Sequence, residues 1–390
     1  MNKSAVNKKR LIAAILIMSL FQMGMVGLSP VTASISQAFP GISELTAQLA
    51  ATFLNLVLVI TAIFSGVISR RFGRRWMTVT GLMLFVAAGV CGTLFSVNIA
   101  AVYVWSALLG AGTGLFVPVA SSLMMDDLDE RERAGIAGWQ TAAVNIGGVV
   151  FSLGAGLLAS GAWSRTYLMY VLALPAALFC LRALPKKRGE RAGNGERSSG
   201  GMPPAPVWMA ALCTMLFAVL YFVFSTNVSL LAAEKGLSAT TASGVLSACF
   251  MLGGVVFGLL FARALGLLGR ALPAAAFLLL ALSYGAVCVF GALPALMLAA
   301  MVGGGSLSLI FPYYVITIAD RVDPAASVLS ASLIVSIGPN FGSFISPMII
   351  TNLAGLFGAS VTDRFLLAGT LAVLGCVILL ARARRKEKSK

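Results

Sequence analysis

The sequence lacks histidine and contains few charged residues. Only 11% of its 390 residues are Asp, Glu, Lys or Arg, whereas soluble proteins carry about 25%. The absence of histidine excludes a histidine metal site and a histidine proton relay. The six cysteines lie far apart within apolar runs, so we interpret them as small buried hydrophobic residues. We therefore predict no disulfide framework, no metal site and no cofactor.

Apolar sequence is abundant, because 59% of the residues are hydrophobic. About 20 consecutive apolar residues suffice to cross a bilayer as a helix, and such runs recur along the whole chain. We place twelve of them at 11–36, 45–69, 76–97, 98–125, 134–159, 165–184, 206–232, 240–262, 271–290, 294–319, 325–353 and 363–381. The predicted fold class is an all-α membrane protein with twelve transmembrane helices.

The twelve spans form two groups of six. Between the groups, residues 185–205 are first charged, then rich in Gly and Ser, then rich in Pro. Such a composition cannot bury enough apolar area to fold and is typical of a flexible connection. We therefore predict an N-terminal six-helix bundle over 1–184, a cytoplasmic linker over 185–205 and a C-terminal six-helix bundle over 206–390.

The charges are distributed unevenly. The chain has 28 Lys and Arg against 13 Asp and Glu, a net charge of +15. If the N-terminus is cytoplasmic, all the cations fall inside except Arg165, Lys235 and Arg364. This is the positive-inside pattern of a cytoplasmic membrane protein with both termini inside. The cations then face anionic lipid, so we expect no nucleic-acid partner. The basic, apolar N-terminus imitates a secretory signal, but the even number of spans favours its retention.

The two halves repeat each other at a nearly constant offset. The matched positions are Asn145 and Gly147 with Asn340 and Gly342, Ser43 and Thr46 with Ser238 and Thr241, and Pro118 with Pro312. Because each copy holds six spans, both copies have the same orientation in the membrane. The sequence thus predicts two parallel-repeated six-helix bundles, related by an axis along the membrane normal.

The loop between spans 2 and 3 carries the best local motif. It reads Gly66-Val-Ile-Ser-Arg70-Arg71-Phe-Gly73-Arg74-Arg75. This loop resembles the G-x-x-x-D-R-x-G-R-R element of the major facilitator superfamily (MFS), and the resemblance extends over nearly the whole chain. Gly66 would allow close packing at a helix end, and Gly73 would allow a tight turn. Arg74 could pair with an acid at the end of span 4, where Asp126 and Asp127 lie. The resemblance implies that such a pair latches the outward-facing state.

The chain departs from the family pattern at several positions. Arg70 occupies the acidic position of the motif, and Ser106 stands where drug–proton antiporters of the family carry an arginine. Span 5 also lacks their Gly-Pro motif. The length and short loops resemble the efflux branch, with degenerate motifs. The drug-antiporter interpretation is correspondingly weakened.

No acid, lysine or arginine falls in the middle of a predicted span. Because a charge at the bilayer centre costs at least ~2.5–3.5 kcal/mol, its absence argues against a permanently charged substrate. We predict a transporter that moves a small neutral or zwitterionic organic molecule by alternating access, through facilitated diffusion or exchange. The alternatives are a proton-coupled multidrug efflux pump that uses Glu44 or Asp363, a lipid translocator, and a non-transporting membrane receptor.

The candidate site consists of uncharged polar and aromatic side chains within the spans. The expected substrate-binding residues are Gln22, Asn55, Phe116, Thr141, Asn145, Tyr221, Asn227, Phe311, Tyr314, Ser336 and Asn340, and the expected gating residues are Gly66, Gly73, Arg74 and Asp126. The family resemblance implies that spans 1, 4, 7 and 10 line the cavity. We find no catalytic constellation and no nucleotide-binding signature, so we predict no enzyme activity. The expected partners are a small-molecule substrate and the lipid bilayer, with the chain as a monomer.

Overall fold

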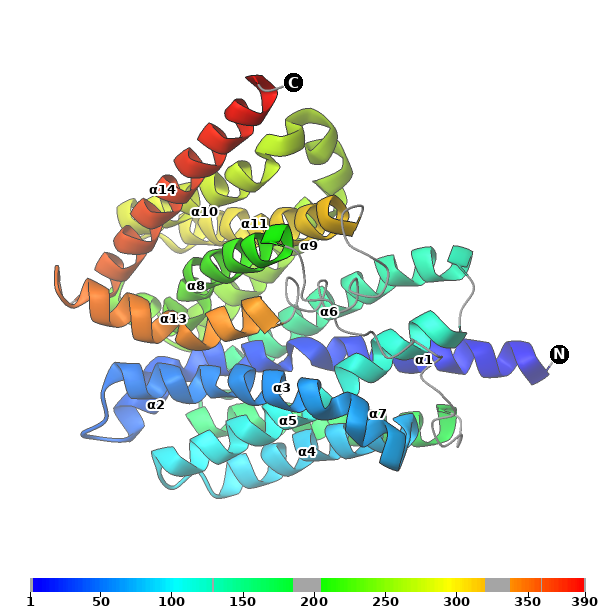
Figure 1. Ribbon diagram of the computed structural model, residues 1–390. Coiled ribbons are helices and arrows are strands. Elements are labelled where there is room, and N and C mark those ends of the chain that lie inside the picture. The colour runs from blue at the N-terminus through cyan, green and yellow to red at the C-terminus, as the bar shows by residue number, and fades with distance from the viewer. Residues whose placement is uncertain (1–2, 128–129, 185–204, 320–336, 359, 389–390) are drawn as a thin grey trace. The chain divides into compact units, whose positions relative to one another are not determined.

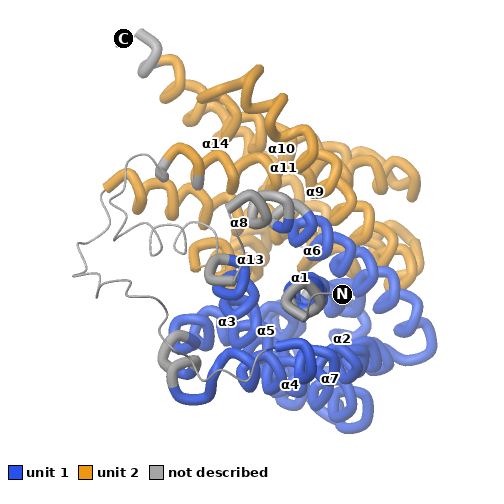
Figure 2. Tube along the Cα trace, turned by 90° about the vertical axis from the view of Figure 1, so that its right-hand side faces the viewer, with its two compact units in different colours: residues 1–194 blue, residues 195–390 orange. Residues whose placement is uncertain are grey.

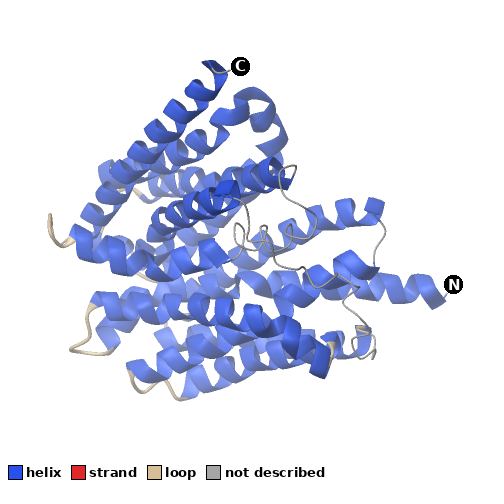
Figure 3. Cartoon of the chain, viewed as in Figure 1, coloured by secondary structure: helices blue, strands red, loops and turns tan. Residues whose placement is uncertain are grey.

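The computed structural model of the protein describes residues 3–127, 130–184, 205–319, 337–358 and 360–388. All regular secondary structure in these ranges is helical (Figure 3). The chain divides into two compact units, residues 1–194 and 195–390, which Figure 2 shows in blue and orange. Each unit is described separately below. The predicted linker falls almost entirely outside the described residues, and helix α8 begins at Ala205.

Unit 1 begins with a span built from several helical segments (Figure 1). Its elements are α1 (Lys3–Gln22), the 3₁₀ helix η1 (Met23–Val31), α2 (Thr32–Ala38), α3 (Glu44–Phe72), α4 (Arg74–Leu94), α5 (Ile99–Asp127), α6 (Glu130–Leu158), η2 (Trp163–Leu172) and α7 (Ala173–Ala183).

Unit 2 begins with one uninterrupted helix of 30 residues. Its elements are α8 (Ala205–Glu234), α9 (Thr241–Leu268), η3 (Gly269–Ala271), α10 (Leu272–Val289), α11 (Leu293–Ala319), α13 (Gly338–Ala354) and α14 (Val361–Lys388).

The described helices agree with twelve spans. Ten helical stretches are long and apolar enough to cross a membrane, and one of them, Thr241–Val289, contains both α9 and α10 over 49 residues. Helix α13, with 17 described residues, corresponds to span 11. Several helices extend past the predicted spans at charged ends, as α3 does to Phe72. A helix of 29 residues is about 43 Å long, so its charged end reaches beyond a hydrocarbon layer about 30 Å thick.

The first span is not the single α-helix that the hydropathy predicts. It changes from α1 to the 3₁₀ helix η1 after Gln22 and becomes α-helical again at Thr32. Pro30 lies inside η1, and proline removes a backbone donor from a helix. Gly24 and Gly27 in the same segment lie against the rings of Phe85 and Tyr170. Local packing and proline together explain the interruption.

The helices of the two units pack in corresponding pairs. In unit 1, α5 packs against α3 and α4, and α6 packs against α1. In unit 2, α11 packs against α9 and α10, and α13 packs against α8. In each unit, therefore, the fourth span packs on the second and third, and the fifth span packs on the first. The internal repeat of the sequence is therefore a repeat of helix packing.

Glycines at matched positions let paired helices approach closely. Gly147 of α6 lies against the carbonyl of Leu20 in α1. Gly342 of α13 lies against the carbonyl of Met215 in α8, and a Cβ added there would be 2.6 Å from that oxygen. Both the two glycines and the two carbonyl residues are 195 positions apart. Because lipid offers no hydrophobic drive for helix association, such small-residue contacts determine which helices can pair.

The matched serines are helix caps. The backbone N–H of Thr46 donates to Ser43 Oγ at 3.2 Å at the start of α3. The backbone N–H of Thr241 donates to Ser238 Oγ at 3.3 Å at the start of α9. An N-cap side chain satisfies a backbone donor that the first turn leaves open. The repeated Ser–Thr spacing therefore marks equivalent helix starts.

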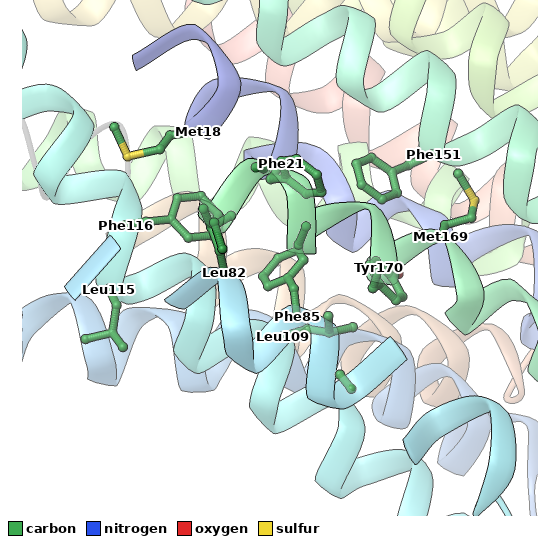
Figure 4. Packing of buried hydrophobic residues seen from close by; sticks show 14 of the residues in the cluster. Met18, Phe21, Leu82, Phe85, Leu109, Leu115, Phe116, Phe151, Met169 and Tyr170 are labelled. Carbon is green, nitrogen blue, oxygen red and sulfur yellow. The ribbon is translucent and has the colours of Figure 1, made fainter. Parts of the chain in front are cut away.

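The interior of unit 1 contains a cluster of aromatic rings (Figure 4). Phe85 of α4 lies edge-on to Phe21, Phe116 and Tyr170, with ring centroids 5.6–6.1 Å apart. Phe151 of α6 stacks on Tyr170 at 5.6 Å. Edge-to-face and offset-stacked rings are the favoured arrangements of aromatic pairs. The cluster joins the first helix of unit 1 to α4, α5, α6 and η2.

We predict that Gly147→Ala lowers the thermal midpoint of the detergent-solubilised protein. The new methyl group would overlap the Leu20 carbonyl, and overpacking of this kind costs about 1–3 kcal/mol. Gly285→Ala in α10 is the matched control, because nothing lies within 4 Å of its added Cβ. An equal midpoint for the two variants would contradict the packing role of Gly147.

Candidate functional site

The middle of the first span in unit 1 has irregular backbone and polar contacts. Gln22 is the last residue of α1 and lies near the centre of the apolar stretch Lys8–Ala38. Just beyond it, the Tyr170 hydroxyl of η2 donates to the Gly24 carbonyl at 2.9 Å. A stretch of 3₁₀ helix within a longer helix often marks a hinge. Here the Tyr170 hydroxyl, from another helix, donates a hydrogen bond to a carbonyl of the 3₁₀ segment.

The corresponding part of unit 2 has the same kind of contact. Ser346 Oγ of α13 donates to the Val219 carbonyl of α8 at 2.6 Å, and Val219 lies 195 positions after Gly24. The Tyr284 hydroxyl of α10 lies 2.7 Å from the next carbonyl, that of Leu220, and 3.1 Å from that of Tyr221. In both units, hydroxyl groups of neighbouring helices therefore hold backbone carbonyls near the middle of the first helix.

In unit 1, two predicted site residues lie beside this region. Gly147 packs on Leu20, so Asn145 and Gln22 are each two residues from the same interhelical contact. Asn145 is half-buried, and its Nδ2 donates to the Thr141 carbonyl at 2.9 Å. The Thr141 side chain is exposed. Two residues are just over half a helical turn, so neither amide faces the Gly147–Leu20 contact itself, although both lie at the depth of the mid-span irregularity.

In unit 2, Asn340 and Tyr221 each lie within three residues of the equivalent contact. Gly342 packs against Met215 and Ala218 of α8. Asn340 precedes this glycine by two residues and is half-buried. Tyr221 is one turn past Ala218, is buried, and donates its hydroxyl to the Gly304 carbonyl at 3.4 Å. Ser336, which is predicted on the same polar face, lies outside the described residues.

Other predicted residues lie elsewhere in their units. Asn55 of α3 is buried and follows Leu54, whose carbonyl lies against Gly110 of α5. The side chain of Phe116 is fully buried and packs on Phe85 within the aromatic core.

Tyr314 is also distant from the Tyr221 region. Its hydroxyl donates to Cys213 Sγ at 3.0 Å, and its ring packs near the start of α8. Cys213 precedes Tyr221 by eight residues, which is about 12 Å along a helix. Phe311, one turn earlier in α11, is half-buried. The aromatic side chain of Tyr314 in span 10 therefore lies at a different depth in unit 2 from that of Tyr221.

The predicted gating residues lie at one end of α4 and α5. Gly73 separates α3 from α4 with φ of +79°, a conformation that favours glycine. Arg74 is the first residue of α4 and is half-buried. Asp126 belongs to the last turn of α5, which packs on α4. The Asp126 side chain and the surroundings of Gly66 lie outside the described residues, so the latch stays a prediction.

A buried cation is the main feature that sequence reasoning missed. Arg364, expected outside, is only 7% exposed, and its Nη1 donates to Asn227 Oδ1 of α8 at 2.9 Å. Asn227 in turn donates Nδ2 to the Val223 carbonyl and to Thr226 Oγ1, both at 3.0 Å. A buried charge requires hydrogen-bonding partners. Arg364 lies three residues after Val361, the first residue of α14. From the sequence alone, this position was interpreted as lying just outside the membrane at the start of the last span.

The acids near this cation act as helix caps. The Glu234 carboxylate, at the end of α8, accepts hydrogen bonds from the backbone N–H groups of Val361 and Thr362 and from the Thr362 hydroxyl. Ser360 and Asp363 cap each other, each backbone N–H donating to the other side chain at 3.1 Å. Such contacts satisfy the open donors of a helix N-terminus. They join α8 to the beginning of α14.

The family model of the Major Facilitator Superfamily matches residues 11–213, just over half of the chain. The chain belongs to the Major Facilitator Superfamily. As a member of this family it is a multi-pass membrane transporter and not an enzyme. No curated protein sequence matches the chain significantly.

Solved structures of superfamily transporters share the fold. A variant of the nucleoside transporter NupG has a TM-score of 0.76 at 13% identity, over 95% of this chain and 99% of that one. A peptide transporter of the POT family in complex with sulfate also scores 0.76, at 16% identity, over 99% and 98%. A bacterial homologue of the lysosomal transporter Spinster scores 0.70 at 17% identity, over 96% of both chains. These identities show a shared fold and leave the substrate open.

We predict that Asn227→Ala and Arg364→Met each lower the thermal midpoint of this superfamily member. Each change removes a hydrogen bond between a buried amide and a buried cation, which is worth about 1–3 kcal/mol. The double variant should lose less than the sum of the single losses, because the two residues share that bond. Arg165→Met is the control, since Arg165 is exposed. Additive losses would show that the contact is not a stabilising pair.

Proposed function

We propose that the protein moves a small neutral or zwitterionic organic molecule across a cytoplasmic membrane by alternating access, as a facilitator or an exchanger. The observation that carries this proposal is the uncharged chemistry of the mid-span regions. Gln22, Asn145 and Asn340 are half-buried and offer amide groups in or beside the first helix of each unit. Superfamily transporters bind substrate near the midplane at the repeat interface. Amides and hydroxyls suit a ligand without net charge.

The positions of the charges support the same proposal. Among the residues whose side-chain burial the structure describes, Arg364 is the only charged residue that is buried, and it lies near the start of α14 rather than in its middle. Asp363 and Glu234 are engaged in capping. Glu44 is the first residue of α3, where the helix dipole stabilises a negative charge. These structural roles of the outer acids make a proton-coupled efflux pump the less favoured alternative.

The proposed transport cycle uses the two units as the moving parts. Each unit is internally compact, so rocking of one against the other would expose the polar residues to each side in turn. Gly73 and Arg74 at the α3–α4 junction, with Asp126 at the end of α5, would form the latch of one state. We also propose that both termini face the cytoplasm, on the basis of the positive-inside charge pattern.

A ligand screen and a transport assay test the function together. We expect neutral or zwitterionic compounds to raise the thermal midpoint, since a ligand at 100 times its Kd stabilises by about 2.7 kcal/mol. Proteoliposomes should then show counterflow of such a compound without an imposed pH gradient. Asp363→Asn and Glu44→Gln should retain this counterflow. If cationic drugs alone bind, and uptake requires a proton gradient, the efflux-pump alternative is correct.

For the identified compound, Asn340→Ala should weaken binding about threefold to tenfold, the usual value of one hydrogen bond. The thermal midpoint without ligand should fall less than it does in Asn227→Ala, because Asn340 is half-buried and Asn227 is fully buried. Asn352→Ala, on the exposed surface of the same helix, is the matched control. Unchanged affinity in Asn340→Ala would remove this residue from the site.

We predict that Gly73→Val slows turnover while substrate affinity is retained. The positive φ of Gly73 strains any residue with a Cβ by about 1–3 kcal/mol, so the α3–α4 junction must change shape. Gly266→Val, near the end of α9 with open space around its Cβ, is the control at the corresponding helix end. Turnover and affinity can be separated by counterflow rates over a range of substrate concentrations. A normal rate for Gly73→Val would argue against the gating role.

A further inference from the structure

Unit 1 contains two unusually long 3₁₀ helices that pack against each other. Helix η1 has nine residues and η2 has ten, and the two are neighbours. Runs of 3₁₀ helix longer than three or four residues are uncommon, because their hydrogen-bond geometry is poorer than that of an α-helix. A strained backbone segment persists only where the surrounding structure holds it. The contacts of η1 and η2 therefore show what holds them.

The small residues of η1 follow the period of a 3₁₀ helix. Gly24, Gly27 and Pro30 are three positions apart, so they lie on one face of a helix with three residues per turn. Tyr170 of η2, labelled in Figure 4, donates its hydroxyl to the Gly24 carbonyl at 2.9 Å. A Cβ added at Gly27 would lie 2.9 Å from that hydroxyl oxygen, and one added at Gly24 would lie 2.9 Å from the Phe85 ring. The glycine face of η1 thus accommodates Tyr170.

Unit 2 shows the same positions without these groups. At the repeat offset of 195, Val219 and Phe222 stand in place of the two glycines, and Phe365 stands in place of Tyr170. Their helices, α8 and α14, are α-helical throughout. The corresponding stretches are therefore α-helical where the glycines and the tyrosine hydroxyl are absent. This comparison identifies the α-helix as the alternative conformation of η1 and η2.

The outer ends of the two segments are also joined, and short loops follow them. Phe39, directly after α2, lies edge-on to Trp163, the first residue of η2, with ring centroids 5.6 Å apart. Residues 39–43 connect α2 to α3, and residues 159–162 connect α6 to η2. Gly41 in the first loop has φ of +94° and open space around it. A change in one segment is therefore passed to the other, and the loops have room to follow.

We infer that η1 and η2 form a paired length switch, in which both exchange together between 3₁₀ and α geometry and the Tyr170–Gly24 hydrogen bond holds the longer, 3₁₀ form. A 3₁₀ helix rises about 2.0 Å per residue and an α-helix about 1.5 Å. The exchange therefore shortens the first span by about 4.5 Å and the sixth by about 5 Å. It also unwinds each segment by about half a turn, which the two loops take up. Rocking of whole units does not require this change, so the inference is separate from the proposed function.

Distances between spin labels in the full-length, detergent-solubilised protein test the inference. The labels are attached to keto amino acids, so that the native cysteines stay in place, and distances are measured by double electron–electron resonance. One pair, at Arg10 and Gln37, spans η1, and the other, at Ser160 and Arg182, spans η2; all four positions are exposed. Tyr170→Phe removes the hydroxyl that holds the 3₁₀ form. It should shorten the two distances by about 4.5 and 5 Å.

Tyr167→Phe is the matched control. Tyr167 is also buried in η2, but its hydroxyl has no hydrogen-bond partner among the residues that the structure describes, so both distances should stay as in the wild type. Labels at Ala205 and Ala233 of α8 should give one distance in every variant. Unchanged distances in Tyr170→Phe, even with a lowered thermal midpoint, would mean that Tyr170 only stabilises packing. Equal shortening in Tyr167→Phe would mean general loosening, and shortening of one span alone would mean that the segments are not paired. Each of these results overturns the inference.

A second variant decides the question if Tyr170→Phe does not fold. Pro30→Ala restores the backbone N–H that proline removes from η1 and leaves Tyr170 in place. Because this N–H can complete an α-helical hydrogen bond, the variant should also shorten both distances. Wild-type distances in Pro30→Ala would then overturn the inference.

Discussion

The close approach of helix backbones at glycine is the constraint on which both units depend. Helices in lipid gain little from apolar contact alone, so they associate where small residues allow tight packing. Gly147 against Leu20 and Gly342 against Met215 set the position of the fifth helix against the first in each unit. Gly110 and Gly304 do the same for α5 on α3 and α11 on α9. The polar groups reach their neighbours because these contacts align the helices.

The middle of the first helix in each unit depends on that alignment. Tyr170 reaches the Gly24 carbonyl, and Tyr284 and Ser346 reach the carbonyls of α8. In a membrane every buried backbone group must find a partner within the protein. The irregular backbone of η1 is therefore sustained by a hydroxyl from η2. Gln22 directly precedes this segment, and Asn145 lies two residues before the glycine of α6 that packs on Leu20.

The charged groups follow a different rule from the mid-span polar groups. Glu234 and Asp363 complete the first turn of α14, and Arg364 bonds to Asn227 just inside that end. The arginines at the α3–α4 junction lie where a bilayer presents its headgroups. Charges thus stay near the ends of the spans, where desolvation is least expensive. The uncharged middle of each unit is the consequence that bears most directly on the choice of substrate.

Hydropathy was sufficient to predict twelve spans, because a bilayer imposes length and polarity on every helix that crosses it. The superfamily was predicted from the internal repeat and from the resemblance of the loop Gly66–Arg75 to the family motif. The sequence showed matched spacings for Ser43 with Ser238 and for Gly147 with Gly342. The structure shows that the serines cap helices and that the glycines are contacts between helices. The sequence could not show that the first span changes helix type after Gln22, because that depends on Phe85 and Tyr170 packing on its glycines. Nor could it place Phe116 in the core or bury Arg364. Hydropathy gives the depth of a residue in the membrane, whereas only the packing of neighbouring helices determines which way its side chain faces and what it meets there.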